Sequence, residues 1–179
     1  MKKLSILVLF LLFAVCGKIF AQGADSEYSS KGLDAKDQGR FDEAIEYQTK
    51  AIEINPSSTN YNNRGSAYAA KGDYAQALAD FTKAIELSPG NSTAYANRAI
   101  AHYYLKEYDL AWRDSQASEK AGRSYDHEFI VALRDAPGGS YQNDPEFLKA
   151  LETPTPAIMD KKLKEIVDNA LSRDDAEQY

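Results

Sequence analysis

The sequence is poor in the residues that most often carry catalytic chemistry. Its 179 residues include one cysteine and two histidines, and neither histidine has a partner at the spacing of metal ligands. A phosphate-cradling glycine loop, a Gly-x-Ser-x-Gly motif and a Cys-x-x-Cys motif are also absent. The carboxylates are scattered over predicted helix surfaces, where solvation and salt pairing explain them. We therefore predict a protein that is not an enzyme and holds no cofactor or metal.

Basic residues are also in deficit. The chain has 21 lysines and arginines against 27 aspartates and glutamates, which gives a formal charge of −6. A nucleic-acid-binding protein needs a basic stripe to neutralise phosphates, so this balance argues against one. At 44% hydrophobic residues the chain is too apolar to be disordered. Tyrosine is abundant, with 12 residues, which suggests thin paired layers rather than one thick core.

The one long hydrophobic run lies at the N-terminus. Two lysines precede an apolar run over residues 4–15, and small residues come after it. Because a membrane-spanning helix needs about 20 apolar residues and Lys18 interrupts this run, the pattern predicts a cleaved signal peptide over residues 1–23. The protein is therefore expected to be exported, either to a periplasm or out of the cell.

Cys16 lies at the end of this run and leaves two alternatives. It could be acylated and become the first residue of a lipoprotein, which would attach the chain to a membrane. A lipoprotein signal needs a small residue before the cysteine, however, and Val15 is not small. We therefore favour removal of Cys16 with the signal peptide, which leaves a mature chain with no thiol and no disulfide.

Internal repetition governs the middle of the chain. Three segments align with one another, over residues 39–56, 72–89 and 106–122. Each contains an aromatic residue with alanine three positions later, and successive segments are offset by 33 and then 34 residues. Apolar residues recur at helical spacing, while glycine or proline marks the helix ends. No strand pattern is present, so the expected fold is all-α and built from helix-turn-helix pairs.

These repeats resemble the tetratricopeptide repeat family. The matching residues are Tyr28, Gly32, Gly39, Phe41, Ala44, Ala51 and Pro56 in the first repeat, Tyr61, Gly65, Tyr68, Gly72, Tyr74, Ala77, Phe81, Ala84 and Pro89 in the second, and Tyr95, Ala99, Tyr108 and Ala111 in the third. The resemblance implies a right-handed α-solenoid of three helix-turn-helix repeats. The small residues let the paired helices approach closely, and the aromatic residues close the gaps between them.

The C-terminal third is predicted to cap the solenoid. Residues 126–135 begin with a capping aspartate and have apolar residues at helical spacing, as a helix covering the last repeat requires. Residues 137–140 break this helix, and Asp144-Pro145 starts another short one. The predicted domains are thus a signal peptide over 1–23, a repeat domain with its capping helix over 24–136, and a helical extension over 137–179.

The last predicted helix runs from Pro156 to about Ser172 and is amphipathic. Its apolar face contains Met159, Leu163, Ile166, Val167 and Ala170. Three roles are open for this face: packing on the end of the solenoid, pairing with another subunit, or occupying the chain's own groove.

The resemblance also implies where a partner would bind. In this family the first helices of the repeats line a concave surface that usually receives a segment of another protein. The candidate peptide-binding residues at those positions are Asn62, Asn63, Ser66, Asn97, Ile100, Tyr103 and Tyr104. The two equivalent asparagines, Asn63 and Asn97, could bond either a ligand backbone or a neighbouring helix. The two tyrosines could anchor a ligand or pack against the segment after the third repeat.

One branch of the family clamps the acidic carboxy-terminus of cytosolic heat-shock chaperones. It uses lysine, arginine and asparagine at five positions, which here hold Ser29, Leu33, Asn63, Thr93 and Asn97. Only Asn63 fits, and every cation is missing. A carboxylate binds poorly without charge-assisted donors, so we reject that specificity.

The charged and titratable residues outside the groove receive structural roles. Arg64 and Arg98 recur in successive repeats but lie off the groove, so we expect them to pair with a neighbouring helix. His102 takes the place of a tyrosine in the packing, and His127 is expected at the surface in the first turn of the capping helix.

The leading interpretation is an exported, non-catalytic scaffold that binds a protein or peptide segment in its concave groove. Its setting would be a bacterial envelope, as an accessory of an assembly or transport complex. Two alternatives remain: a structural protein that dimerises through its C-terminal helix, and a subunit that holds a small ligand for a transporter.

Overall fold

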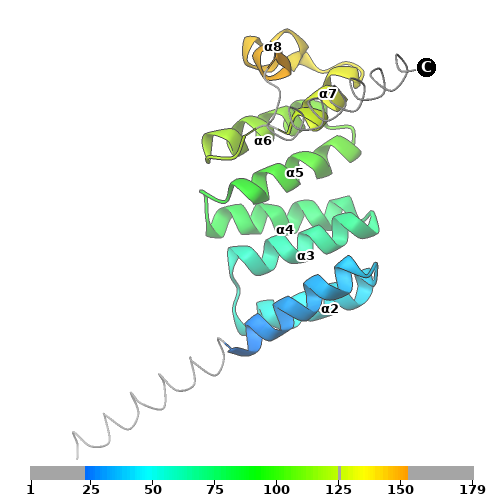
Figure 1. Cartoon of the computed structure of the whole chain (residues 1–179), viewed down its shortest axis with the longest axis vertical. Coiled ribbons are helices and arrows are strands. Elements are labelled where there is room, and N and C mark those ends of the chain that lie inside the picture. Colours follow the sequence, from blue (N-terminus) through cyan, green and yellow to red (C-terminus); the bar gives the residue numbers. More distant parts are fainter. Residues whose placement is uncertain (1–22, 125, 153–179) are drawn as a thin grey trace, which may run out of the picture.

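The computed structural model describes residues 23–124 and 126–152, which form an elongated stack of helices (Figure 1). Within these residues the regular elements are helices, with no strand, as the all-α prediction requires. The predicted N-terminal signal, Cys16 and the amphipathic helix after Pro156 lie outside the described residues.

The helices succeed one another along the stack in chain order. After a helical segment over residues 23–37, the elements are α2 (Phe41–Ile54), α3 (Ser58–Lys71), α4 (Tyr74–Leu87), α5 (Ser92–Tyr104), α6 (Tyr108–Lys120), α7 (His127–Asp135), the 3-10 helix η1 (Ser140–Asn143) and α8 (Pro145–Glu152). From α2 to α6 each helix packs on the next, and α3 also contacts α5. The segment 23–37, α3 and α5 are the first helices of the three repeats, and α2, α4 and α6 are the second. The predicted helix-turn-helix solenoid is therefore confirmed.

A left-handed residue ends the first helix of each repeat. Gly39 and Gly72 have φ angles of 75° and 94°, which glycine adopts without steric cost. At the second of these turns the backbone N–H of Asp73 donates to Tyr68 O at 2.9 Å, which satisfies a carbonyl at the end of α3. The third repeat places Lys106 at the equivalent position, with a φ of 63°. A lysine there is strained, because its Cβ crowds the backbone in this conformation.

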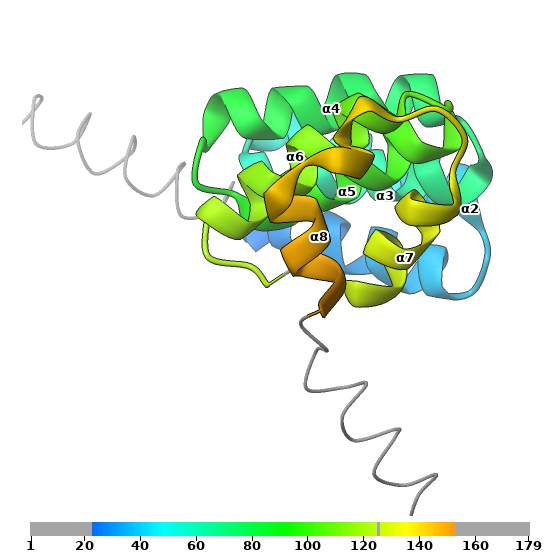
Figure 2. The same cartoon turned by 90° about the horizontal axis from the view of Figure 1, so that it is seen from above.

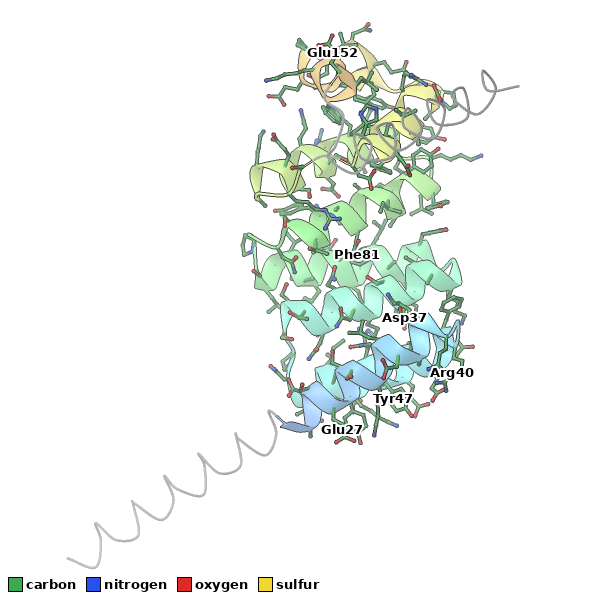
Figure 3. All side chains as sticks on the ribbon, in the orientation of Figure 1. Glu27, Asp37, Arg40, Tyr47, Phe81 and Glu152 are labelled. Carbon is green, nitrogen blue, oxygen red and sulfur yellow. The ribbon has the colours of Figure 1, made fainter. Side chains whose placement is uncertain are left out.

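The helices approach closely where a first-helix residue lacks a side chain. A Cβ atom added to Gly65 would lie 2.7 Å from Phe81 Cε1, so the ring of Phe81 packs directly against the backbone of α3. Phe81 itself is 1% exposed and lies in the middle of the stack (Figure 3). Ala77 and Ala84, on the same helix as Phe81, are fully buried. The small residues that the repeat pattern predicts at these positions are thus the contact points between helices.

The elements after the third repeat close the C-terminal end of the stack, where α7 and α8 lie nearest the viewer in Figure 2. They form one apolar cluster with α6, which contains Ala111, Trp112, Ile130, Leu133, Tyr141, Phe147 and Ala150. Asp126 caps α7 as predicted. Asp144 accepts a hydrogen bond from Trp112 Nε1 at 2.9 Å, which lowers the pKa of its carboxyl group. Residues 140–152, which make up most of the described part of the predicted extension, therefore pack together with the capping helix.

Candidate functional site

Polar side chains connect the first helices of successive repeats. Asn63 Nδ2 donates to Ser29 Oγ at 3.2 Å. Asn97 Nδ2 lies 3.0 Å from Asn62 Oδ1 and 3.3 Å from Ser66 Oγ. The sequence leaves open whether Asn63 and Asn97 face a ligand or a neighbouring helix, and both side chains bond the neighbouring helix. Among the described residues nothing donates to the Oδ1 atom of either, so these two oxygens are available to a ligand backbone N–H.

The adjacent tyrosines at the end of α5 have different surroundings. Tyr103 is half-buried, and its ring packs edge-on against Tyr108 and Phe129, with centroid distances of 5.6 and 5.7 Å. Tyr104 is 57% exposed and stacks on Tyr74 at 4.6 Å, with an interplanar angle of 8°. Tyr103 therefore holds the capping helix, whereas Tyr104 contacts the rings of Tyr74 and Tyr103 and presents the rest of its own ring to solvent.

The exposed side of the segment 23–37, α3 and α5 is here called the first-helix face. Leu33 and Ile100 occupy equivalent positions in the first and third repeats, and each is 38% exposed. Ser66 holds the same position in the second repeat, and the small side chain of Ala70 one turn further on is also exposed. The face is thus apolar at its two ends and small or polar in the middle.

A pocket opens where α5 and α6 meet the beginning of α7, and we call it the α5–α7 pocket. It is lined by Ala96, Asn97 and Ile100 from α5, Ser115 and Ser118 from α6, and Arg123, Ser124, Asp126 and Phe129 from the loop and α7. Asn97 and Ile100 are the two predicted binding residues that line it. The sequence analysis did not identify Arg123 as a candidate binding residue. It stands at the position where the earlier repeats have Pro56 and Pro89, and this difference could have indicated it.

The recurring arginines form the same arrangement twice. Arg64 on α3 bonds Asp80 on α4 with two contacts of 2.8 Å, and its third nitrogen donates to Thr49 Oγ1 on α2 at 3.2 Å. The same set recurs one repeat later in Arg98 on α5, Asp114 on α6 and Thr82 on α4, at 2.7, 2.8 and 3.2 Å. The bonds to aspartate raise the pKa of both arginines. The predicted pairing with neighbouring helices is confirmed.

The two histidines lie apart from each other. His102 Nδ1 lies 2.6 Å from Glu107 Oε2, and its Nε2 lies 3.6 Å from Asp114 Oδ2, so the ring packs between α5 and α6. His127 is in the first turn of α7 as predicted, but it is half-buried. Over residues 23–124 and 126–152, no group of His, Cys, Asp and Glu side chains is arranged to hold a metal ion. The same ranges contain no helix long and apolar enough to cross a membrane.

Comparison with known proteins identifies the repeats. Models of the tetratricopeptide repeat (TPR) family match residues 28–58 and residues 61–91. No curated protein matches the chain. Among solved structures, the Arabidopsis OM64 TPR domain is 28% identical with a TM-score of 0.60, and the match covers 64% of this chain and 97% of that one.

Two further structures have similar folds. The first TPR domain of the human RPAP3 protein is 25% identical with a TM-score of 0.58, over 72% of this chain and 93% of that one. The second TPR of Spaghetti (RPAP3), bound to the HSP90 peptide SRMEEVD, is 26% identical with a TM-score of 0.55, over 58% of this chain and 96% of that one.

Proposed function

We propose that this chain, which belongs to the tetratricopeptide repeat family, is a non-catalytic scaffold that binds a segment of another protein on its first-helix face. The observation that carries the proposal is the chemistry of that face. Ile100 and Tyr104 are exposed and apolar residues of α5, and the free amide oxygens of Asn97 and Asn63 lie on α5 and on the first helix before it, α3. Apolar anchors beside backbone-binding groups are what an extended peptide segment requires. The similar TPR of Spaghetti is bound to a peptide, which supports this choice.

The chemistry of the face argues against an acidic chaperone tail as the ligand. At the positions that such a clamp fills with lysine, arginine and asparagine, Ser29 and Asn63 bond each other and Leu33 is apolar. Lys36, the nearby cation, pairs with Asp37 at 3.4 Å. A ligand with a cluster of carboxylates would therefore lose its hydration without gaining charge-assisted bonds. A largely neutral segment with apolar anchors fits the face better.

The proposed setting is the cell envelope, after export. It rests on the N-terminal sequence, in which two lysines, an apolar run and small residues succeed one another. Sequencing the N-terminus of the mature protein tests this, because cleavage near residue 23 is expected and retention of residues 1–22 would contradict export. A lipid label on Cys16 would instead identify a lipoprotein.

A pair of matched double variants tests binding on the first-helix face. Ala70→Arg with Tyr104→Ala places a bulky cation on this face and removes its exposed ring. Ala75→Arg with Leu87→Ala makes the same two kinds of change on α4, at exposed positions of the other helix layer. We expect the first variant to lose capture of partners from envelope extracts, and the second to retain it.

The readout is crosslinking and then identification of the captured protein, with helix content measured by circular dichroism to show that both variants fold. Equal capture by the two variants would overturn the proposal. The alternative of a small-ligand subunit is less favoured, because neither Tyr103 nor Tyr104 lines the α5–α7 pocket.

A further inference from the structure

We infer that the α5–α7 pocket is a subsite for a partner segment that carries one aliphatic side chain and, close to it, one carboxylate. The inference rests on the proposed function and adds the chemical class of the ligand. It also adds a residue, Arg123, that lies outside the positions used by the family's known clamp.

The pocket occurs where the third repeat departs from the second. At equivalent positions, Ile100 replaces Ser66, Ser115 replaces Phe81 and Arg123 replaces Pro89. Phe81 fills the space beneath α3 in the second repeat, whereas the much smaller Ser115 lines the pocket in the third. Three positions that differ between the two repeats, and that lie far apart in the sequence, are thus close together in the fold. In the third repeat they form an open pocket that contains a cation, where the second repeat is filled by the ring of Phe81.

One wall of the pocket is apolar and firmly held. Ala96, Ile100 and Phe129 contribute to it, and Ile100 is 38% exposed. The ring of Phe129 packs edge-on against Tyr103 at 5.7 Å, which fixes the wall from behind. An aliphatic side chain placed here would bury apolar surface on both partners without rearranging the pocket.

Arg123 brings an uncompensated charge to the same pocket. Its guanidinium group makes no hydrogen bond or ion pair with any described residue. Among the other described arginines, Arg113 is also unpaired but does not line the pocket, whereas Arg40, Arg64, Arg98 and Arg134 are paired. Its backbone is nevertheless fixed, because its N–H donates to Ser118 O at 3.1 Å after the left-handed Gly122. A carboxylate on the ligand would accept two parallel bonds from this group.

Asp126 is the acidic residue of the pocket, and it is already engaged. Its Oδ1 accepts from the backbone N–H groups of Glu128 and Phe129, at 3.1 and 3.3 Å, so its charge is offset by the N-terminus of α7. No ion pair joins it to Arg123 among the described contacts. The pocket therefore keeps a net preference for an acidic over a basic ligand group.

Three synthetic peptides provide a direct test with the purified full chain. Each is acetylated, amidated and fluorescently labelled, and each carries one leucine and one aspartate in a Gly-Ser background, separated by one, two or three residues. We expect at least one of them to bind saturably by fluorescence anisotropy. Replacing its aspartate with asparagine, or using Arg123→Gln protein, should weaken binding at least tenfold.

The apolar half of the subsite has a matched control within the chain. Ile100→Ser introduces the residue that the second repeat has at this position and should also weaken binding at least tenfold. Leu110→Ser removes an aliphatic side chain at a similarly exposed residue of α6, which lies outside the first-helix face and does not line the pocket, and it should leave binding unchanged. Raising the salt concentration should weaken wild-type binding more than that of Arg123→Gln.

The inference is overturned if none of the three peptides binds saturably, if Arg123→Gln binds as well as the wild type, or if Leu110→Ser loses as much affinity as Ile100→Ser. The proposed function fails separately. It stands if the Ala70→Arg, Tyr104→Ala variant loses its captured partner while its matched control does not, whatever the peptides do.

Discussion

The second and third repeats have the same helices and the same arginine–aspartate–threonine contacts. They differ in the junction between the first and second helix of the repeat, which is filled in the second repeat and open in the third. In the second, the ring of Phe81 packs against Gly65. In the third, the equivalent residues are Ser115 and Ala99, and Ser115 lines a pocket. The contacts that stabilise the solenoid are therefore the ones that recur in each repeat. The candidate binding residues are found at positions where the third repeat differs from the second.

The largest effect is expected from breaking the filled junction. Phe81→Ala should lower the free energy of unfolding by about 3–5 kcal/mol, because it leaves a cavity beneath α3. Gly65→Ala alone should lower it by about 1–3 kcal/mol, because the added Cβ meets the ring. In the Phe81→Ala background the same Gly65→Ala change should raise stability, since its methyl group then fills vacated space. Urea unfolding of the four proteins measures this. A Gly65→Ala cost that is the same in both backgrounds would contradict the close contact.

A smaller effect tests what the repeats share. Asp80→Ala and Asp114→Ala each leave a largely buried arginine without its carboxylate, and each should cost about 2–3 kcal/mol of unfolding free energy. Asp114 also lies 3.6 Å from His102 Nε2, but the two sets of arginine contacts have nearly the same distances, so the two costs should agree within about 1 kcal/mol. A leucine pair replacing Arg64 and Asp80 should be less destabilising than Asp80→Ala, since it leaves no buried charge. Chemical denaturation gives all three values, and two clearly unequal aspartate costs would show that the repeats are not equivalent here.

The smallest effect concerns the turn inside each repeat. Lys106→Gly should raise the free energy of unfolding by about 0.5–1 kcal/mol, because glycine adopts the left-handed conformation without crowding. Gly72→Lys, the opposite exchange in the second repeat, should lower it by a similar amount. Thermal unfolding of the two variants against the wild type measures both shifts. If Lys106→Gly destabilises the protein, the lysine side chain makes a stabilising contact that outweighs its backbone strain.

The candidate site could be predicted only in part from the sequence. The period of 33 and 34 residues identified the first helices, and with them the face that contains Asn97, Ile100 and Tyr104. Which of the predicted residues is exposed depends on how neighbouring helices are tilted and on which elements pack against them. Tyr103 therefore holds α7, although the adjacent Tyr104 faces solvent.

The structure of the segment after the third repeat could also be predicted only in part from the sequence. The sequence predicts a break over residues 137–140, and in the structure η1 begins at the last residue of this break, Ser140. The ring of Tyr141 lies against Gly139 and is buried in the terminal cluster. The hydroxyl of Tyr141 donates to Leu133 O at 2.8 Å, and burial raises the pKa of this tyrosine to about 12. A short turn of this kind has no periodicity, so only its tertiary contacts specify it.

The sequence by itself determined the helices, their pairing, the glycine turns and the arginine pairs, because each of these arises from local spacing that repeats along the chain. It also showed that cations are missing from the positions of an acidic clamp. Only the tertiary structure decided that Ile100, Ser115 and Arg123 meet in one pocket, and that Asn63 and Asn97 donate to neighbouring helices. The physical reason is that a repeat pattern specifies the contacts between equivalent positions of neighbouring helices. Residues that differ from the pattern, such as Ile100, Ser115 and Arg123, form a site only if the fold places them next to one another.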